Sequence, residues 1–169
     1  MSDDDDVVAV LTRQHRQLEA QLRGLLEATE EGDAEACAVL LARAGDELAV
    51  RILAEEQLVY PAVHAARTEG VLLESLEEHL SLKRLLADLL VLDPGETTFT
   101  PKCKVMEEQA RHHHKEEEEH LFPQMRQLLD APSLRAMGAA VKAHEQALRA
   151  SGAPRERVGV QTAAAAPLV

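Results

Sequence analysis

Residues 113–123 read HHKEEEEHLFP, and residues 51–61 read RILAEEQLVYP. In both segments two adjacent glutamates lie six and five positions before a proline, and an aromatic residue directly precedes that proline. A histidine lies upstream of each segment, His15 in one case and His79 in the other, and leucines follow both histidines at the same offsets. These matched patterns predict that the chain contains two copies of one helical hairpin.

Apolar residues follow helical spacing over most of the chain. Aromatic residues make up only 2% of the 169 residues, and alanine, leucine and glutamate, which favour helices, dominate. Apolar positions recur every three or four residues over the ranges 7–30, 34–67, 69–92, 101–129 and 133–150. The expected fold is all-α: an up-down-up-down four-helix bundle with a short fifth C-terminal helix, covering residues 1–150.

Several short segments are expected to begin, bend or end these helices. The aspartates at positions 3–6 can cap the first helix, and Pro61 should kink or end the second. Thr100 and Pro101 form a cap and first turn that open the fourth helix. Residues 151–169 carry glycine, proline and an alanine run without a pattern, and they are expected to be a disordered tail.

The composition also narrows the class of protein. A formal net charge of −12 argues against nucleic acid and anionic membranes as partners. No apolar run reaches the roughly 20 residues that span a bilayer, and the first residues lack the positive charge of a signal peptide. The two cysteines, Cys37 and Cys103, are far apart in the sequence, and neither has another cysteine beside it in the sequence. We therefore expect a cytoplasmic protein.

Histidine and glutamate in the apolar stripes indicate a metal site. His113 and Glu117 are four residues apart, so they lie one above the other on one helix face. Imidazole nitrogen and carboxylate oxygen suit iron, and carboxylates can hold two metal ions close together. Packing of the two hairpins about a pseudo-two-fold axis would gather five candidate metal ligands at the bundle centre: His15, Glu55, His79, His113 and Glu117.

Other registers of the histidine run have the same four-residue spacing. His112 pairs with Glu116 in this way, and His114 pairs with Glu118. The apolar stripe and the distance to Pro123 select the His113 register instead. His112, His114 and His120 are accordingly expected at the surface or just outside the site.

The run H-x-x-x-E-E-x-x-L-F-P at residues 113–123 resembles the cation-binding motif of the hemerythrin-like (HHE) family. Glu55, Glu56, Tyr60 and Pro61 resemble its first copy, and the likeness covers roughly residues 7–130. The resemblance implies a non-haem di-iron centre bridged by two carboxylates. In that centre Glu55 and Glu117 are the bridges, one iron takes His15, and the other takes His79 and His113.

Two positions depart from the family pattern. Arg51 stands where the first copy normally starts with histidine, and Lys83 stands where hemerythrins proper carry another histidine. Arginine cannot be a metal ligand, so Arg51 either rotates out of the core or pairs with the core carboxylates and replaces one metal. Water or Glu116 would fill the missing positions, with His64 and His144 as further substitutes.

These observations leave three hypotheses for function. The leading one is a non-haem iron protein, di-iron or mononuclear, that senses or removes dioxygen, nitric oxide or peroxide at an open coordination position. An enzymatic activity on nitric oxide or peroxide would fit that site. The second is a metal-free helical interaction module in which Arg51 neutralises the core carboxylates, and the third is a simple metal store. The oligomeric state is not predicted.

Overall fold

The computed structural model describes residues 6–169 and is helical, without strands, over that range. Its helices are α1 (Val7–Glu31), α2 (Ala34–Ala54), α3 (Tyr60–Ala62), α4 (Glu69–Val91), α5 (Phe99–Glu116), α6 (Phe122–Leu128), α7 (Ala131–Ala150) and α8 (Pro154–Gly159). Two π-helical turns join helices end to end: η2 (Glu55–Val59) links α2 to α3, and η3 (Glu117–Leu121) links α5 to α6. None of the described helices is both long and apolar enough to cross a bilayer.

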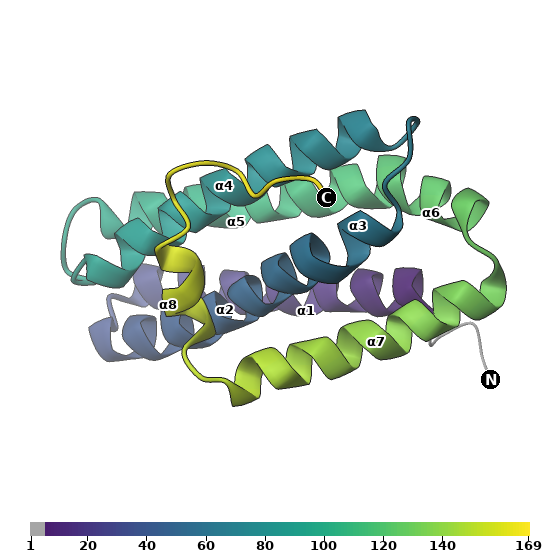
Figure 1. Ribbon diagram of the computed structural model, residues 1–169. Helices are drawn as coiled ribbons and strands as arrows, with labels where there is room; N and C mark the ends of the chain where they lie inside the picture. The colour runs from purple at the N-terminus through teal and green to yellow at the C-terminus, as the bar shows by residue number, and fades with distance from the viewer. Residues whose placement is uncertain (1–5) are drawn as a thin grey trace.

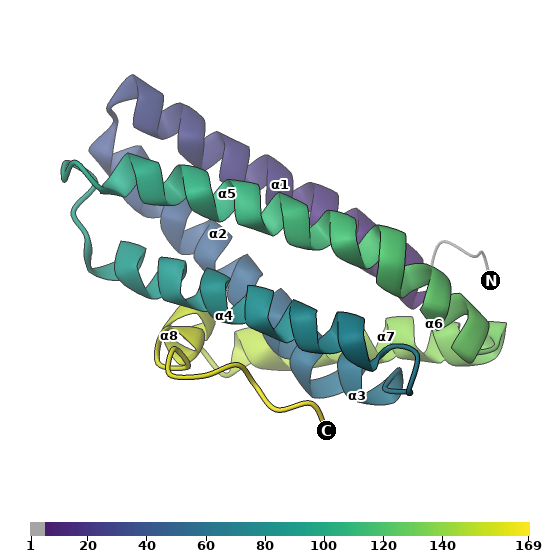
Figure 2. The ribbon, with the colours of Figure 1, turned by 90° about the horizontal axis from the view of Figure 1, so that it is seen from above.

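Four long helical rods form a bundle (Figures 1 and 2): α1, the α2–α3 rod, α4 and the α5–α6 rod. α1 packs against α2 and α5, and α4 packs against α5. α7 lies along α1 and α2, so the expected fifth helix is present, and α8 packs on α2 and α4. The connections from α1 to α2 and from α4 to α5 lie at one end of the bundle, and the connection from α3 to α4 lies at the other (Figure 1).

The helix ends follow local capping chemistry. The Asp6 carboxylate accepts a hydrogen bond from the Ala9 amide at 2.8 Å, which caps α1, while residues 3–5 of the predicted cap lie outside the described part of the chain. Gly32, with a φ of 69°, ends α1 in the left-handed conformation that glycine adopts without steric cost. The fourth helix begins at Phe99, earlier than predicted, and therefore contains Pro101 in its first turn. Proline is tolerated there because the amides of the first turn have no acceptor within the helix, so the missing amide of proline costs no helical hydrogen bond.

Each of the two repeated prolines follows a π-helical turn. The Tyr60 amide donates to the Glu55 carbonyl, and the Phe122 amide donates to the Glu117 carbonyl, five residues back instead of four. A proline in a regular helix clashes with the carbonyl four residues before it, and the wider turn relieves that contact. The second helical rod therefore passes through Pro61 and ends at Ala62, short of the predicted residue 67.

Two apolar clusters fill the bundle, with a polar layer between them. One cluster includes Leu18, Leu53 and Leu82, and the other includes Leu11 and Val59. His15 lies between Leu11 and Leu18 in the sequence, and the other core histidines and glutamates are placed in the same way between members of the two clusters. The repeated hairpins thus bring their polar residues to one level of the core.

The prediction of a disordered tail is wrong. Residues 154–159 form α8, Val158 is fully buried, and Leu168 packs against the second apolar cluster. The Arg84 guanidinium donates to the carbonyls of Thr162 and Ala163. Apolar contacts and side-chain-to-backbone hydrogen bonds of this kind do not need a periodic pattern, so composition alone did not reveal them.

Candidate metal centre

The five residues selected from the sequence meet in the polar layer. His15 comes from α1, Glu55 from η2, His79 from α4, His113 from α5 and Glu117 from η3. Each of them is at most 4% exposed. They form two overlapping groups that could each hold a metal ion, with ligand atoms within 4.8 Å of one another: Glu55, His79 and His113 in one group, and His15, Glu55 and Glu117 in the other.

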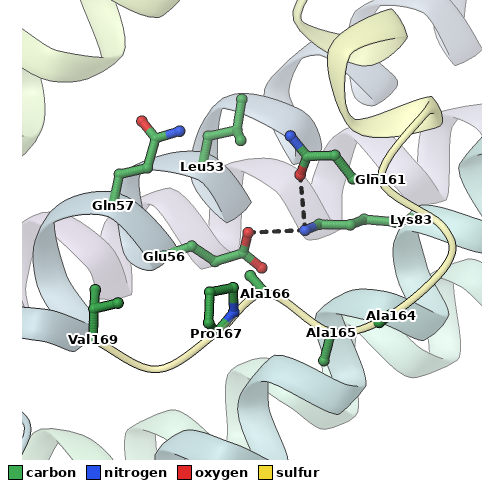
Figure 3. Close-up of a pocket in the computed structure, with 10 residues that line it drawn as sticks. All are labelled: Leu53, Glu56, Gln57, Lys83, Gln161, Ala164, Ala165, Ala166, Pro167 and Val169. Carbon is green, nitrogen blue, oxygen red and sulfur yellow. Dashed lines mark hydrogen bonds and ion pairs between the residues drawn. The ribbon is translucent and has the colours of Figure 1, made fainter.

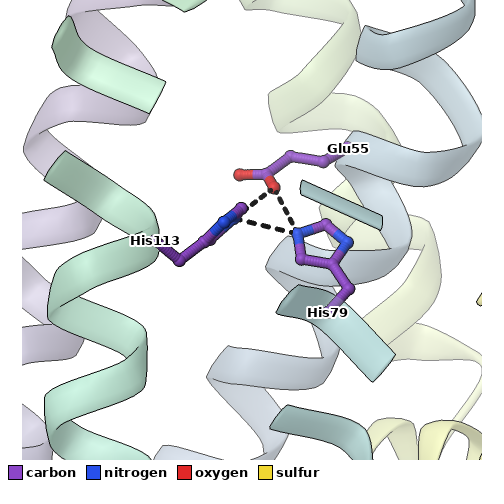
Figure 4. Close-up of side chains that lie close together, drawn as sticks. All are labelled: Glu55, His79 and His113. Carbon is purple, nitrogen blue, oxygen red and sulfur yellow. Dashed lines mark hydrogen bonds and ion pairs between the residues drawn. The ribbon is translucent and has the colours of Figure 1, made fainter. Parts of the chain in front are cut away.

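Ring nitrogens and carboxylate oxygens face one another at short distances. The Nε2 atom of His79 lies 3.0 Å from Glu55 Oε2 and 3.0 Å from His113 Nε2 (Figure 4). On the other side of the layer, Glu117 Oε1 lies 2.9 Å from His113 Nε2 and 3.6 Å from His15 Nε2. Three imidazoles thus direct Nε2, the nitrogen that commonly binds metals, toward two shared carboxylates.

Two atoms of the polar layer, His15 Nε2 and Glu117 Oε1, are among the buried side-chain atoms that have no hydrogen-bond partner within residues 6–169. The short approach of His113 to Glu117 is not aligned for a hydrogen bond, so it leaves the carboxylate oxygen unsatisfied. Buried polar atoms without partners are rare because each one costs the free energy of its lost hydration. A cation between these donor atoms would satisfy them, and nitrogen with carboxylate oxygen is a donor set that suits iron.

The charges of the layer also favour a cation. Burial and the charge of Glu117 raise the pKa of the Glu55 carboxyl, but the two facing imidazoles outweigh both and hold it at about 2. Burial likewise raises the pKa of Glu117, and the charge of His113 lowers it well below the usual range. Both core glutamates are therefore ionised at neutral pH, and without metal their charge is balanced by the protonated imidazoles that face them, so a metal ion would take the place of these protons.

The second glutamate of each repeated pair contacts the Nδ1 atom of a histidine in the other hairpin, on the side of the ring opposite Nε2. Glu56 Oε2 lies 3.0 Å from His79 Nδ1, and Glu118 Oε2 lies 3.2 Å from His15 Nδ1. A third carboxylate, Glu78, lies 3.3 Å from Nδ1 of His113. Carboxylates at Nδ1 fix the ring orientation and direct the Nε2 lone pair toward a metal. Glu56 and Glu118 belong to the repeated glutamate pairs, but their contacts with the histidines were not predicted, and neither was the contact of Glu78.

The sequence model of the family described as hemerythrin HHE cation binding domain matches residues 6–125. The chain belongs to the hemerythrin family. Comparison with curated proteins and with solved structures gave no match. The matched range contains both hairpins and all five core residues of this hemerythrin domain, whereas α7, α8 and the residues after them lie outside it.

The aromatic residue before each proline packs on the same histidine as the outer glutamate. In this hemerythrin domain the ring of Tyr60 stacks on His79 with centroids 5.5 Å apart, and Phe122 stacks on His15 at 5.6 Å. The Tyr60 hydroxyl also donates to Glu55 at 3.0 Å and lies 3.3 Å from a Glu117 oxygen. The Tyr60 hydroxyl thus contacts both core carboxylates.

Replacing Tyr60 with phenylalanine tests that contact, because phenylalanine already fills the matching place in the other hairpin. We expect the fold to persist and the chelator-treated protein to lose about 1.5–3 kcal/mol of unfolding free energy, the usual value of a hydrogen bond to a charged group. Urea unfolding with and without metal measures this loss. An unchanged midpoint in chelator would show that the hydroxyl does not support the carboxylates.

Arg51 has rotated away from the core carboxylates. Its guanidinium lies 2.8 Å from Glu47 and 3.7 Å from Glu145 of α7, and no ion pair joins it to Glu55 or Glu117 in the described chain. The interpretation in which Arg51 neutralises the core acids is therefore wrong. The permanent positive charge of Arg51 is thus paired with carboxylates outside the polar layer, although Arg51 remains buried and still interacts electrostatically with Glu55.

The remaining candidates for a missing ligand lie outside the layer. Glu116 pairs with His120, and the side chains of His112 and His120 are 62% and 58% exposed. His64 is exposed, and the half-buried His144 bonds to Gln57. None of these side chains belongs to either ligand group.

His114 is the exception among these histidines, because it is buried beside the layer. Its ring stacks on His15 with centroids 4.0 Å apart, and its Nδ1 lies 2.9 Å from Glu19. Burial lowers the pKa of His114 to about 4 although Glu19 raises it, so the ring is neutral at pH 7. His114 therefore packs against a candidate ligand without adding positive charge.

Proposed function

We propose that this protein holds two non-haem iron ions in the polar layer and uses them to sense or remove a small ligand. The observation that carries the proposal is the pair of unpartnered buried atoms, His15 Nε2 and Glu117 Oε1, within overlapping ligand groups. Membership of a cation-binding family supports the same conclusion. Two buried, unpaired thiols, Cys37 and Cys103, support a reducing cytoplasmic location.

Each group of residues would hold one ion. Glu55, His79 and His113 provide one carboxylate and two imidazoles, while His15 and Glu117, with Glu55 shared, provide the other set. Iron supplies one-electron chemistry and binds dioxygen, nitric oxide or peroxide. Because Arg51 and Lys83 replace nitrogen ligands, the protein leaves coordination positions open for such a ligand. An incomplete histidine set favours sensing or removal over reversible oxygen carriage.

Anaerobic reconstitution with ferrous iron tests the proposal. We expect about two irons per chain after desalting, because two ligand groups share one carboxylate. The His113→Ala variant should retain about one iron or fewer, whereas the matched His112→Ala variant should bind as the wild type does, since His112 is exposed. Fewer than about one iron per wild-type chain, or equal loss in both variants, would contradict the proposal.

Reaction of the iron-loaded protein with small ligands separates the functions that remain. A sensor should bind nitric oxide or dioxygen stoichiometrically, and a detoxifying enzyme should consume repeated additions of peroxide or nitric oxide. Iron that is bound but undergoes no change in absorption with any of the three ligands would instead indicate a metal store. Rapid-mixing absorption spectroscopy under anaerobic control distinguishes these results.

A further inference from the structure

A continuous line of polar contacts connects the C-terminal segment, residues 160–169, to one candidate ligand. Gln161 Oε1 accepts from Lys83 Nζ at 3.0 Å, and the same ammonium donates to Glu56 Oε1 at 2.8 Å. Figure 3 shows both contacts. The other oxygen of Glu56 lies 3.0 Å from His79 Nδ1. The residue at one end lies outside the hemerythrin match, and the residue at the other end belongs to the candidate metal centre.

Lys83 depends on these contacts because it is only 1% exposed. A buried ammonium requires compensating charge and hydrogen-bond acceptors, and loss of either is costly. Glu56 supplies the charge, and Gln161 supplies a second acceptor. Lys83, which stands where hemerythrins proper carry a histidine, thus has a hydrogen-bond acceptor, Gln161, that the C-terminal segment contributes.

The C-terminal segment is held firmly enough to serve as such a support. Arg84 donates to the carbonyls of Thr162 and Ala163 at 2.9 and 3.3 Å, and Leu168 packs on the apolar core. In Figure 3 the segment passes beside Glu56 and Lys83, and it lines a cavity of about 520 Å³ together with Leu53. These contacts hold the backbone next to Gln161, and Gln161 itself is an exposed residue whose amide oxygen reaches Lys83.

The other half of the centre has no such connection. Glu118, which contacts Nδ1 of His15, pairs with Arg16. The Arg16 side chain is 56% exposed, so water can solvate its charge, and both residues lie inside the hemerythrin match. Within residues 6–169, the line of polar contacts from a candidate ligand through a buried cation to a residue beyond position 125 lies on the His79 side.

We propose that Lys83 and Gln161 are positioning residues for His79, and that the C-terminal segment completes the support of one half of the metal centre. This inference rests on the proposed function, because it requires a metal at His79. The charge of Lys83 orients Glu56, and Glu56 fixes the His79 ring with Nε2 toward the Glu55 group. Loosening the segment should weaken metal binding at this half and spare the half that contains His15.

Titration with Co(II), followed by its visible absorption, tests the inference in the full-length protein. We expect wild-type binding in two steps. Lys83→Met should weaken one step by about 10–100-fold, the usual effect of losing support around a metal-binding histidine. Gln161→Ala and Arg84→Ala should weaken the same step by a smaller factor, and Lys83→Arg should restore part of the loss. Gln57→Ala is the matched control, because Gln57 lines the same cavity without contacting Lys83.

If Lys83 and Gln161 position His79, their substitutions weaken one Co(II)-binding step, whereas a general loss of stability weakens both. Equal isotherms for wild type, Lys83→Met and Gln161→Ala would overturn the inference. Equal weakening of both steps, with a matching fall in the melting temperature of the chelated protein, would also overturn it by showing a structural role only. Failure of the wild type itself to bind Co(II) or iron would instead overturn the proposed function, and the inference would fall with it.

Discussion

Replacing Glu55 with glutamine is expected to abolish metal binding at both positions of the centre. Glu55 is the residue that the two ligand groups share, so its loss affects both ions. Glutamine keeps the size of the side chain and can still accept the Tyr60 hydrogen bond, but its amide has no negative charge and cannot bridge two cations. A substitution at His15 or His113 should remove only one position, because each belongs to one group.

Metal analysis after reconstitution, together with calorimetric titration, measures this difference. Glu119→Gln is the matched control, since Glu119 belongs to the same acidic run as Glu117 but its side chain is 51% exposed. We expect the control to bind like the wild type and Glu55→Gln to bind less than about a tenth of the wild-type iron, in line with the loss of a bridging ligand. Retention of one full iron by Glu55→Gln would show that the two positions do not share this carboxylate.

Bound metal is also expected to reverse the way in which the free energy of unfolding changes as the pH rises. The carboxylates of Glu117 and Glu118 outweigh burial and raise the pKa of His15 from 6.5 to about 9. A raised pKa in the folded state stabilises the protein fully below pH 6.5, and this contribution is lost as the pH rises through 9. For His15 alone the contribution is on the order of 3 kcal/mol. A metal-bound imidazole is neutral, so the stability of the loaded protein does not depend on a proton at His15. The loaded protein also binds metal more tightly as the pH rises.

Unfolding free energies between pH 6 and pH 9.5, in chelator and in excess metal, measure this reversal. We expect stability in chelator to decrease across the range, and stability in metal to stay level or increase. His15→Gln should remove most of the decrease in chelator, and His112→Ala should leave it unchanged. Parallel curves with and without metal would mean that metal binding does not displace a proton from His15.

The residues that meet in the core could be found from the sequence because the chain repeats itself. The repeat set Glu55 against Glu117 and His15 against His79, and the apolar stripe selected His113 from a run of three histidines. The structure brings these residues together, and their role as ligands remains a prediction. The same repeat appears in the backbone, where a π-helical turn precedes each of the repeated prolines, Pro61 and Pro123.

The supports around the core could not be predicted, because they depend on how the two hairpins pack. Glu56 and Glu118 each reach across to a histidine of the other hairpin, and no local spacing shows such a contact. The sequence leaves open whether Arg51 points toward or away from the core, and the position of Glu145 on α7 decides between the two. Gln161 lies 78 residues from Lys83 in a segment without helical pattern, so its contact was invisible to periodicity.

Anomalous diffraction at the iron edge, from crystals of the reconstituted protein, tests the central claim most directly. We expect two peaks about 3.5–4 Å apart inside the bundle, one beside His79 and His113 and the other beside His15 and Glu117, with Glu55 between them. Crystals of fully loaded protein that show no peak in the polar layer, or iron only at exposed residues such as His112 and His120, would contradict it.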